Sequence, residues 1–393
     1  EHDYPAEPFP YGVAGWVEND SYVLLYDRYD IWKIDPENNE NPVNLTMNKG
    51  RENHTRFRYQ KLDKEAFFIE KKQDILLRAF NEKNKQSGYF SVNVKANKPP
   101  KQLIMQDYRF TSVKMAKNEN RLIWQKENIS VYPDLWQSNL SFDNPKRLTE
   151  LNPQQKEYNW ATVELVTYHN LDGDEMEGLV YKPENFEPNK KYPLMVYFYR
   201  LHSDELHYHY TPRPSRSIIN PLFYASNGYI VFIPNVRYKT GYPGESAVSC
   251  VVSGTNFMTY KPYIDKENIG IQGQSWGGYQ IAYIVTQTDM YKAASPGAPV
   301  SNMVSAYGGI RWKSGMSRMF QYEESQSRIG GTLWEKPFRY IENSPVFYAD
   351  RINTPLLIRH DDNDGAVPWY QGIELYVALR RLNKPVWLVN YND

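Results

Sequence analysis

The sequence predicts part of a β-propeller in residues 1–155, followed by an α/β domain with a mostly parallel, doubly wound sheet in residues 156–393. The first part consists of short stretches rich in Tyr, Val, Ile and Trp, separated by polar turns and without a long helical pattern. In the second part, continuous apolar runs alternate with amphipathic stretches of helix length. Such alternation is typical of parallel strands covered by helices.

A degenerate repeat in the first part predicts about three propeller blades. Residues 30–35 (DIWKID) precede 44–46 (NLT), residues 134–140 (DLWQSNL) precede 147–149 (RLT), and residues 88–94 form a weaker middle copy. A spacing of roughly 50 residues suits four-stranded blades. Because propellers typically close with about four to eight blades, we expect a further N-terminal part before residue 1. An open β domain of three units is the alternative.

The α/β elements are predicted from apolar runs and turn residues. A turn at 172–174 predicts a pair of strands on either side of it, at 163–168 and 176–181. Four further runs suit strands that are buried on both faces: 194–199, 229–234, 356–358 and 386–389. An amphipathic stretch at 369–382 predicts a helix between the last two runs.

The composition is that of a folded protein without a polyanionic partner. Forty-six Lys and Arg balance forty-six Asp and Glu, so the charge indicates neither nucleic acid nor an anionic membrane. The single Cys250 excludes an internal disulfide. No run of 18 apolar residues predicts a membrane span. The first residues lack an initiator Met and a signal-peptide pattern, so we expect them to lie inside a longer protein.

The strongest chemical signal is Gly-x-Ser-x-Gly at residues 273–277, between an apolar run and a helical pattern. A strand, a tight turn and a helix in this order form a nucleophile elbow, in which glycines leave room for the strained turn. The helix N-terminus stabilises developing negative charge. The pattern therefore predicts Ser275 as a nucleophile; a plain strand-to-helix turn is the alternative.

A serine nucleophile in this fold is followed along the chain by an acid and then by a histidine. Asp364 is the best candidate for the acid, because it lies between a predicted buried strand and a helix; Asp361 and Asp362 compete. No histidine follows Asp364 in the sequence. We expect the base just beyond Asp393, where the chain has passed its last predicted strand.

These residues resemble the prolyl oligopeptidase family of serine peptidases, especially its dipeptidyl-peptidase and acylaminoacyl-peptidase branches. The features that carry the resemblance are a preceding β-propeller and four segments: 193–197, 237–242, the extended elbow 273–279 and the acid loop 360–368. The resemblance implies an α/β-hydrolase fold and a Ser-Asp-His mechanism without a cofactor or a metal ion. The family's last strand leads into Tyr-x-x-Glu-x-His, and Tyr391 matches its tyrosine.

By the same resemblance, the backbone N–H of Trp276 and the hydroxyl of Tyr197 hold the oxyanion. Residues 303–312 correspond to the region that lines the primary pocket, so Tyr307 and Trp312 are expected to shape it around proline or a small apolar residue; core packing is the alternative. Two departures stand out. Residues 198–200 replace a Gly-Gly-Pro-like turn, and Ala366 replaces an Asn of the dipeptidyl branch.

The predicted function is cleavage of short peptides through an acyl-enzyme. The alternatives are an esterase or acylaminoacyl hydrolase on the same scaffold and a catalytically silent binding scaffold. The expected partner is a peptide, a homo-oligomer is left open, and family habit favours a periplasmic or secreted protein. His207 and His209 would share one side of a strand, but a polar hairpin is favoured there over a metal site.

Overall fold

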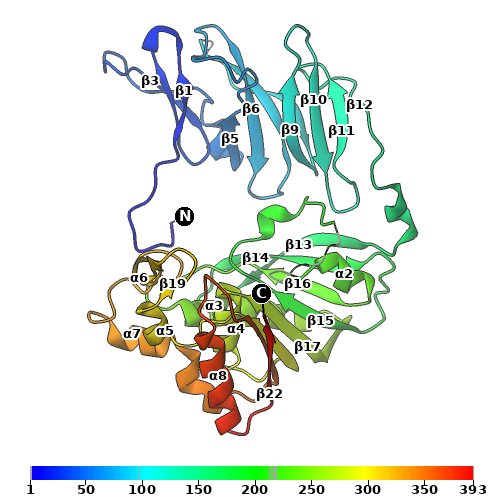
Figure 1. Cartoon of the computed structure of the whole chain (residues 1–393). Helices are drawn as coiled ribbons and strands as arrows, with labels where there is room; N and C mark the ends of the chain where they lie inside the picture. Colours follow the sequence, from blue (N-terminus) through cyan, green and yellow to red (C-terminus); the bar gives the residue numbers. More distant parts are fainter. Residues whose placement is uncertain (1, 96, 212, 214, 216–218, 393) are drawn as a thin grey trace. The chain divides into compact units, whose positions relative to one another are not determined.

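The computed structural model describes residues 2–95, 97–211, 213, 215 and 219–392. These residues form two compact units (Figure 1). Unit 1 contains residues 2–8, 158–203 and the described residues from 210 onward; unit 2 contains residues 9–157 and 204–209. The predicted division after residue 155 lies two residues before residue 157, where the main segment of unit 2 ends. Two short segments also lie in the other unit: residues 2–8 belong to unit 1, and residues 204–209 belong to unit 2.

Ion pairs explain why both short segments change units. The Asp3 carboxylate pairs with Arg200 (2.6 Å) and Arg328 (3.0 Å), which holds the start of the chain in unit 1. In unit 2, the Asp204 carboxylate pairs with Arg56 (2.8 Å) and Lys85 (3.3 Å). Such long-range pairs leave no local trace in a sequence, so the pattern of strands and helices could not predict them.

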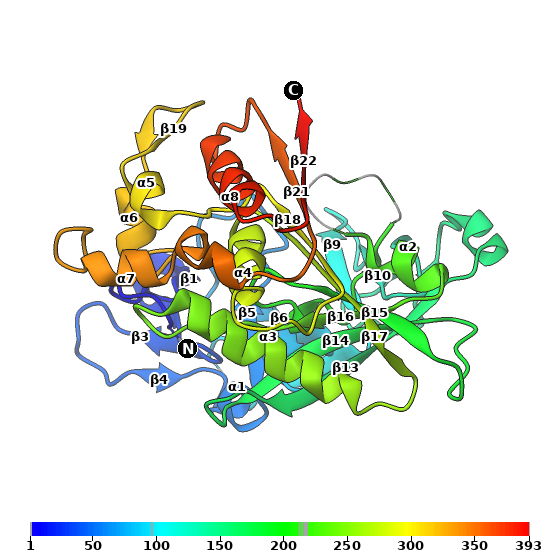
Figure 2. The ribbon, with the colours of Figure 1, turned by 90° about the horizontal axis from the view of Figure 1, so that it is seen from below.

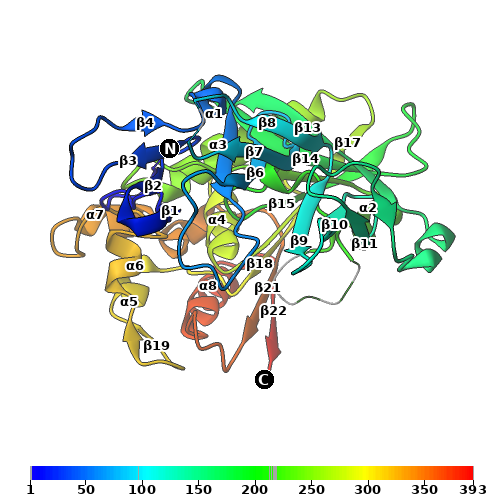
Figure 3. The same cartoon turned by 90° about the horizontal axis from the view of Figure 1, so that it is seen from above.

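Unit 2 consists of three antiparallel sheets of four strands each, which lie side by side in chain order (Figures 1 and 3). Their apolar faces are buried, with Leu24, Leu77 and Trp124 fully inaccessible to solvent. The partial β-propeller predicted from the repeat is the observed fold class of this unit. The strands are β1 (Val13–Trp16), β2 (Val23–Tyr26), β3 (Ile31–Ile34), β4 (Val43–Asn44), β5 (Thr55–Tyr59), β6 (Asp74–Asn81), β7 (Ser87–Asn93), β8 (Lys101–Gln106), β9 (Arg109–Met115), β10 (Leu122–Glu127), β11 (Asp134–Ser138) and β12 (Lys146–Arg147).

A buried hydrogen-bonded pair accounts for the repeat. Thr46 Oγ1 donates to Asp30 Oδ1 (2.6 Å), and Thr149 Oγ1 donates to Asp134 Oδ1 (2.8 Å). Each threonine also accepts a hydrogen bond from the backbone N–H of the residue after the aspartate. The pair thus joins the third strand of a blade to the segment that follows its fourth strand. Buried carboxylates need such partners, which explains why these residue types recur.

Unit 1 is built on an eight-stranded sheet in the order β13-β14-β16-β15-β17-β18-β21-β22. The pairs β13/β14 and β14/β16 are antiparallel, and all other neighbours are parallel. This mixed, mostly parallel sheet confirms the predicted α/β class. The strands are β13 (Ala161–His169), β14 (Glu175–Pro183), β15 (Tyr192–Tyr197), β16 (Ile230–Pro234), β17 (Ile264–Gln274), β18 (Ala293–Gly297), β21 (Leu356–Asp361) and β22 (Val386–Tyr391).

Helices cover the sheet, with α3, α4 and α8 on the same face (Figure 2). All residues of α4 are buried, as are all residues of the central strand β16. None of the helices among the described residues is long and apolar enough to cross a bilayer. The α-helices of unit 1 are α2 (Pro221–Ser226), α3 (Pro243–Thr259), α4 (Trp276–Ile284), α5 (Met303–Tyr307), α6 (Met319–Glu323), α7 (Pro337–Glu342) and α8 (Tyr370–Arg381), and a short hairpin joins β19 (Ile310–Arg311) to β20 (Met316–Ser317).

The last predicted strand is not buried on both faces, contrary to expectation. Trp387 in β22 is 59% exposed, and Val389 is 38% exposed. The reason is its place in the sheet, because β22 is the outermost described strand and pairs only with β21. An apolar run therefore predicted the strand correctly but not its surroundings.

We predict that Asp134→Asn lowers the free energy of unfolding by about 1–3 kcal/mol at pH 7, because a buried carboxylate loses its ion pair with Arg147. Burial raises the pKa of Asp134, but hydrogen bonds from Leu151, Thr149 and Arg147 hold the pKa below its usual range. The difference between wild type and variant should therefore be full above about pH 4 and vanish as the pH falls through the lowered pKa.

Urea unfolding at several pH values measures this difference. Asp143→Asn is the matched control, since this carboxylate is exposed in the same blade and should change stability by less than about 0.5 kcal/mol. Equal effects of the two substitutions would contradict a structural role for the buried pair.

Candidate active site

Ser275 occupies a strained turn between β17 and α4. Its φ is 58° and its ψ is −116°, a conformation that non-glycine residues rarely adopt. Its backbone N–H donates to the carbonyl of Gly297 at the end of β18 (2.8 Å). The predicted strand, turn and helix are thus present, and the turn holds the serine at the carboxyl end of the parallel strands.

The two glycines after Ser275 are required by the close approach of neighbouring backbone. A Cβ atom at Gly277 would lie 2.9 Å from the carbonyl oxygen of Phe198, and one at Gly278 would lie 2.3 Å from that of Gly297. Real Cβ atoms do not come this close to backbone oxygens. Any larger residue at these positions would therefore push α4 away from β15 or β18.

The same approach brings the two predicted oxyanion donors to one end of the sheet. Trp276 is the first residue of α4, where backbone N–H groups have no acceptor within the helix. Tyr197 ends β15 and is paired in register with Gln272 of β17, three residues before Ser275. Its ring is buried. Both predicted donors therefore lie on elements that flank Ser275.

A chain of hydrogen bonds fixes the start of α4 from below. The indole N–H of Trp276 donates to the hydroxyl of Tyr238 (2.9 Å), which donates to Gln280 Oε1 (2.9 Å). The Gln280 amide in turn donates to the carbonyl of Tyr199 (3.0 Å). Burial raises the pKa of Tyr238, so its hydroxyl stays protonated and can donate at any ordinary pH.

Asp364 lies in the loop after β21, and its carboxylate is held by backbone. Its Oδ1 accepts hydrogen bonds from the N–H groups of Ala366 (2.8 Å) and Val367 (3.0 Å). Its Oδ2 is 4.0 Å from His360 Nε2. One oxygen thus fixes the orientation of the side chain, and the other is available to a further donor.

The neighbouring acids and the nearby histidine are placed differently. The Asp361 carboxylate pairs with Arg359 (3.2 Å), and Asp362 Oδ2 accepts a hydrogen bond from the Asn390 amide (3.4 Å). The His360 ring is buried, with Nε2 3.0 Å from the carbonyl of Val367. Burial lowers its pKa. A neutral ring that donates from Nε2 to a carbonyl is a structural group and cannot accept a proton there.

Ser275 and Asp364 line one cavity of about 400 Å³ in unit 1. This is the key geometric result for the site, because the two residues are 89 positions apart in the sequence numbering and come from different strands. Neither Asp362 nor His360 lines this cavity. The other lining residues are Gln274, Arg311, Lys313, Ser314, Asp361, Asn363, Gly365, Ala366 and Val367.

The predicted substrate-binding residues, Tyr307 and Trp312, are close in sequence to residues that line this cavity, but they do not line it themselves. Tyr307 is 1% exposed, and its hydroxyl donates to Glu323 Oε1 (2.6 Å). Trp312 is 46% exposed, with its ring against Tyr370. The lining residues on either side of Trp312 are Arg311 and Lys313, which the sequence analysis did not select.

One sequence signal could have indicated Lys313. A Cβ atom at Gly365 would lie 2.4 Å from the Lys313 side chain, so the glycine next to Asp364 leaves room for a close neighbour. From the sequence alone, that neighbour is unknown. Arg311 is positioned by a hydrogen bond to Gln321 (2.8 Å), which is also invisible in the local pattern.

The end of β22 lies beside the acid loop. Tyr391 pairs in register with Asp361, and the Asp362 N–H donates to the Tyr391 carbonyl (3.1 Å). Because β21 and β22 are parallel, both strands direct the chain toward the same edge of the sheet. Residues that come after β22 therefore start out next to the loop of Asp364.

The segment 202–209 contains three histidines. His209 Nε2 lies 2.9 Å from Gln155 Oε1, and burial lowers the pKa of His209 to about 4. In the part of the chain that the structure describes, no group of three or more His, Cys, Asp or Glu side chains could hold a metal ion.

Comparison with known proteins identifies the relationship. Residues 214–393 match the model of the prolyl oligopeptidase family. The chain is 28% identical over 264 residues to the uncharacterized peptidase YuxL of Bacillus subtilis, covering 63% of this chain and 37% of that protein. It is 26% identical over 275 residues to dipeptidyl-peptidase 5 of Porphyromonas endodontalis, covering 64% and 36%.

Solved structures agree on the fold. The acylaminoacyl peptidase of Pyrococcus horikoshii matches 97% of this chain and 58% of its own, with a TM-score of 0.67 and 20% identity. In the sequence comparison, the matched part of this chain spans little more than a third of the length of YuxL and of dipeptidyl-peptidase 5. The resemblance to the prolyl oligopeptidase family that was inferred from the sequence is confirmed for residues 214–393, which match the model of that family.

Proposed function

We propose that the protein is a serine peptidase that cleaves short peptides through an acyl-enzyme, with Ser275 as nucleophile. The observation that carries the proposal is the shared cavity, which brings the elbow serine and the carboxylate of Asp364 together. The peptidases among its relatives support peptide bonds as the substrate. An esterase or acylaminoacyl hydrolase on the same scaffold would use the same residues, so hydrolysis of esters must be compared with hydrolysis of matched peptides.

In the first step, Ser275 Oγ attacks the carbonyl carbon of the scissile bond while its proton passes to a histidine. The new C–O bond places negative charge on the carbonyl oxygen. The Trp276 N–H and the Tyr197 hydroxyl would donate to this oxyanion. The N-terminus of α4 adds its positive partial charge at the same point.

The base in this proposal is a histidine after Asp393, oriented by Asp364. Two observations support it. The carboxylate of Asp364 has one oxygen fixed by backbone N–H groups, which suits a group that must orient a ring. The end of β22 lies beside the acid loop, so the residues that follow would start next to Asp364.

In the second step, the tetrahedral intermediate collapses and the C–N bond breaks. The protonated histidine gives its proton to the leaving amine, which departs and leaves an ester on Ser275. Water then attacks the ester with the histidine as base, and the free acid and the serine are regenerated. Asp364 stays ionised throughout and stabilises the charged ring.

The preference for proline or a small apolar residue stays a prediction. Because Tyr307 is buried, it could shape such a pocket only by packing behind the residues that line it. Trp312 is exposed, so its ring could contact a longer substrate. Arg311 and Lys313 line the cavity itself, which favours substrates with polar or acidic groups near the cleaved bond. Dipeptidyl-peptidase specificity is not supported by Ala366.

We predict that a fluorophosphonate probe labels the protein isolated from its natural source once, and that Ser275→Ala abolishes labelling. The reason is that the probe reacts only with a serine activated by a base. Intact mass spectrometry before and after treatment measures both the mass of the natural chain and the added group.

A protein that folds but takes up no probe would contradict the proposal and favour a silent binding scaffold. Ser305→Ala is the matched control, because this serine bonds Glu374 outside the cavity and its loss should leave labelling unchanged. Hydrolysis of esters without hydrolysis of matched peptides would instead favour the esterase.

We predict that Asp364→Asn lowers kcat by roughly a thousandfold or more, because an amide cannot hold the ring of the base in the required tautomer. Asp362→Asn, two residues earlier and outside the cavity, should change kcat by less than about tenfold. Steady-state kinetics with a fluorogenic peptide measures both. The opposite ranking would assign the acid role to Asp362.

We predict that Tyr197→Phe lowers kcat by about a hundredfold and leaves KM nearly unchanged, because the hydroxyl acts on charge that exists only in the transition state. The substitution removes a single oxygen atom from a buried ring, so the fold should persist. A rise in KM at constant kcat would show that the hydroxyl binds substrate and does not stabilise the oxyanion.

A further inference from the structure

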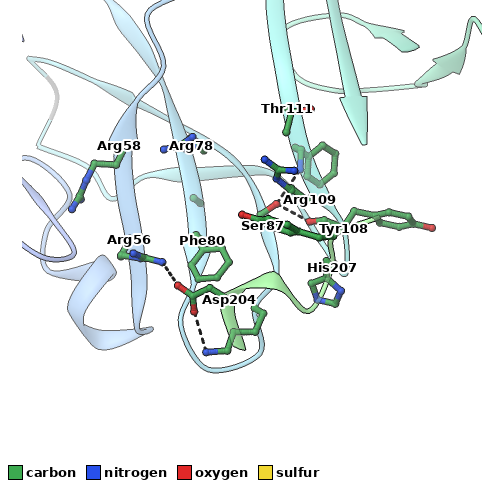
Figure 4. A pocket seen from close by; sticks show the side chains of 14 residues that line it. Arg56, Arg58, Arg78, Phe80, Ser87, Tyr108, Arg109, Thr111, Asp204 and His207 are labelled. Atoms are coloured by element: carbon green, nitrogen blue, oxygen red, sulfur yellow. Dashed lines mark hydrogen bonds and ion pairs between the residues drawn. The ribbon is translucent and has the colours of Figure 1, made fainter. Parts of the chain in front are cut away.

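A second cavity, of about 320 Å³, lies entirely within unit 2 (Figure 4). Strands β5, β6 and β9 supply most of its wall, and the rest comes from the segment 204–209, the start of β7 and the connections before β7 and β9. The proposed peptidase mechanism uses none of these residues. The lining residues are Arg56, Arg58, Arg78, Ala79, Phe80, Lys85, Ser87, Tyr108, Arg109, Phe110, Thr111, Asp204, His207 and Tyr208.

The cavity is strongly cationic. Four arginines and one lysine line it, against the single carboxylate of Asp204. Arg58 of β5 and Arg78 of β6 are directly opposite each other in the antiparallel register. Like charges at such positions are destabilising. Arg56, two residues before Arg58, extends the same face of β5.

Three of these cations, Arg56, Lys85 and Arg109, pair with carboxylates, whereas Arg78 and Arg58 pair with none that the structure describes. Arg56 pairs with Glu82 (3.3 Å) as well as with Asp204, and Arg109 pairs with Glu127 (2.7 Å). Figure 4 shows Asp204 between Arg56 and a lysine ammonium. Within the described part of the chain, no carboxylate forms an ion pair with Arg78, and its guanidinium donates no hydrogen bond.

Arg58 adds to the uncompensated charge. Its guanidinium donates to the carbonyls of Phe57 (2.7 Å) and Arg28 (3.1 Å) and forms no ion pair with a carboxylate among the described residues. Burial is the main cause that lowers the pKa of Arg58; the positive charges of Arg56 and Arg78 lower it further, whereas Tyr26 and the Asp27 carboxylate raise it. An anion in the cavity would relieve this repulsion.

Aromatic rings hold two of the guanidinium groups in place. The Arg56 guanidinium lies 4.7 Å from the ring centre of Phe80, and that of Arg109 lies 4.0 Å from that of Tyr208. Stacking of this kind restricts the side chains before any ligand arrives. The cavity thus combines preorganised charge with apolar walls, and its volume matches sites for small organic ligands, which begin at about 300 Å³.

We propose that this cavity binds the carboxylate of a small organic acid or short peptide, with Arg78 as its principal ion-pair partner. Arg guanidinium and carboxylate pair in a bidentate geometry, and the flanking rings would contact the apolar part of the ligand. The proposal goes beyond the proposed peptidase activity and does not depend on it, because no residue of the Ser275 cavity takes part.

Calorimetric titration of the full-length protein carrying Ser275→Ala tests the proposal, since bound peptides then stay intact. Two probes carry one carboxylate each: N-acetylphenylalanine at its end and N-acetylglutamic acid α-amide in its side chain. The other probes are the fully amidated forms of these two compounds and inorganic phosphate. We expect saturable binding of the free acid and of the glutamic acid α-amide, and no binding of the two fully amidated probes. A preference between the two acids distinguishes a terminal carboxylate from an acidic side chain.

Adding Arg78→Gln should weaken binding of the acids by roughly tenfold, the effect of losing one charge-assisted interaction. Arg121→Gln is the matched control, because Arg121 is exposed in the same unit and does not line the cavity; binding should stay unchanged. Higher salt should weaken binding in the protein with Arg78. Thermal unfolding checks the fold, and Arg78→Gln without ligand should be at least as stable as Arg78.

Four results would overturn the proposal: equal binding of acids and amides, equal binding with and without Arg78, equal losses from Arg78→Gln and Arg121→Gln, or binding of phosphate alone. If Arg78→Gln fails to fold, Arg78→Lys tests the proposal instead. Lysine keeps the positive charge but lacks the bidentate guanidinium, so this variant should bind the acids more weakly than the protein with Arg78. Probe labelling of Ser275 in the wild-type protein is read separately, so failure of either proposal is visible without the other.

Discussion

The site depends on the close approach between the first turn of α4 and the strands around it. The backbone of Gly277 and Gly278 lies against the carbonyls of Phe198 and Gly297, where no Cβ atom fits. A conformation such as that of Ser275 costs about 1–3 kcal/mol and persists only when the surroundings impose it. Here the surroundings are a fully buried helix and two buried strands. Ser275, the N-terminus of α4 and the end of β15 are thereby packed together as one rigid unit.

The order of strands then decides which side chains can meet this piece. In the large sheet, the neighbouring strands β15, β17, β18, β21 and β22 are parallel, so their carboxyl ends form one edge of the sheet. The loop after β21 reaches the cavity of Ser275 from two strands away, and backbone N–H groups hold Asp364 there. Ser275 and Asp364 are far apart along the chain, but the order of the parallel strands in the sheet brings them to the same edge.

The sequence predicted those features that depend on local constraints. The elbow was predictable because its strain requires glycines at fixed spacing around Ser275. The blades were predictable because a buried aspartate needs the same threonine partner each time, as with Asp30 and Asp134. The place of Asp364, in the loop after a strand and before a helix, was predictable; the sequence does not show that Asp364 lines the cavity of Ser275 and that Asp362 does not.

Features that depend on distant partners could not be predicted. Tyr307 was a reasonable candidate for the substrate pocket, but a hydrogen bond to Glu323 keeps its hydroxyl in the interior. Arg311 and Lys313 line the cavity from the short hairpin of β19 and β20, and only Arg311 lies in the segment 303–312 that the resemblance assigns to the pocket. The exposure of Trp387 depends on which strand lies beside β22, which an apolar run does not reveal.

The cationic cavity of unit 2 shows the same limit in a sharper form. In β5, buried Thr55 and Phe57 alternate with Arg56 and Arg58, which reads as an ordinary amphipathic strand. The opposition of Arg58 and Arg78 arises only from the register between β5 and β6, across a long connection. A one-residue slip would separate the two charges but would also turn the apolar face of β6 outward. The hydrophobic core therefore imposes the repulsion on the opposite face, and an anionic ligand would offset it.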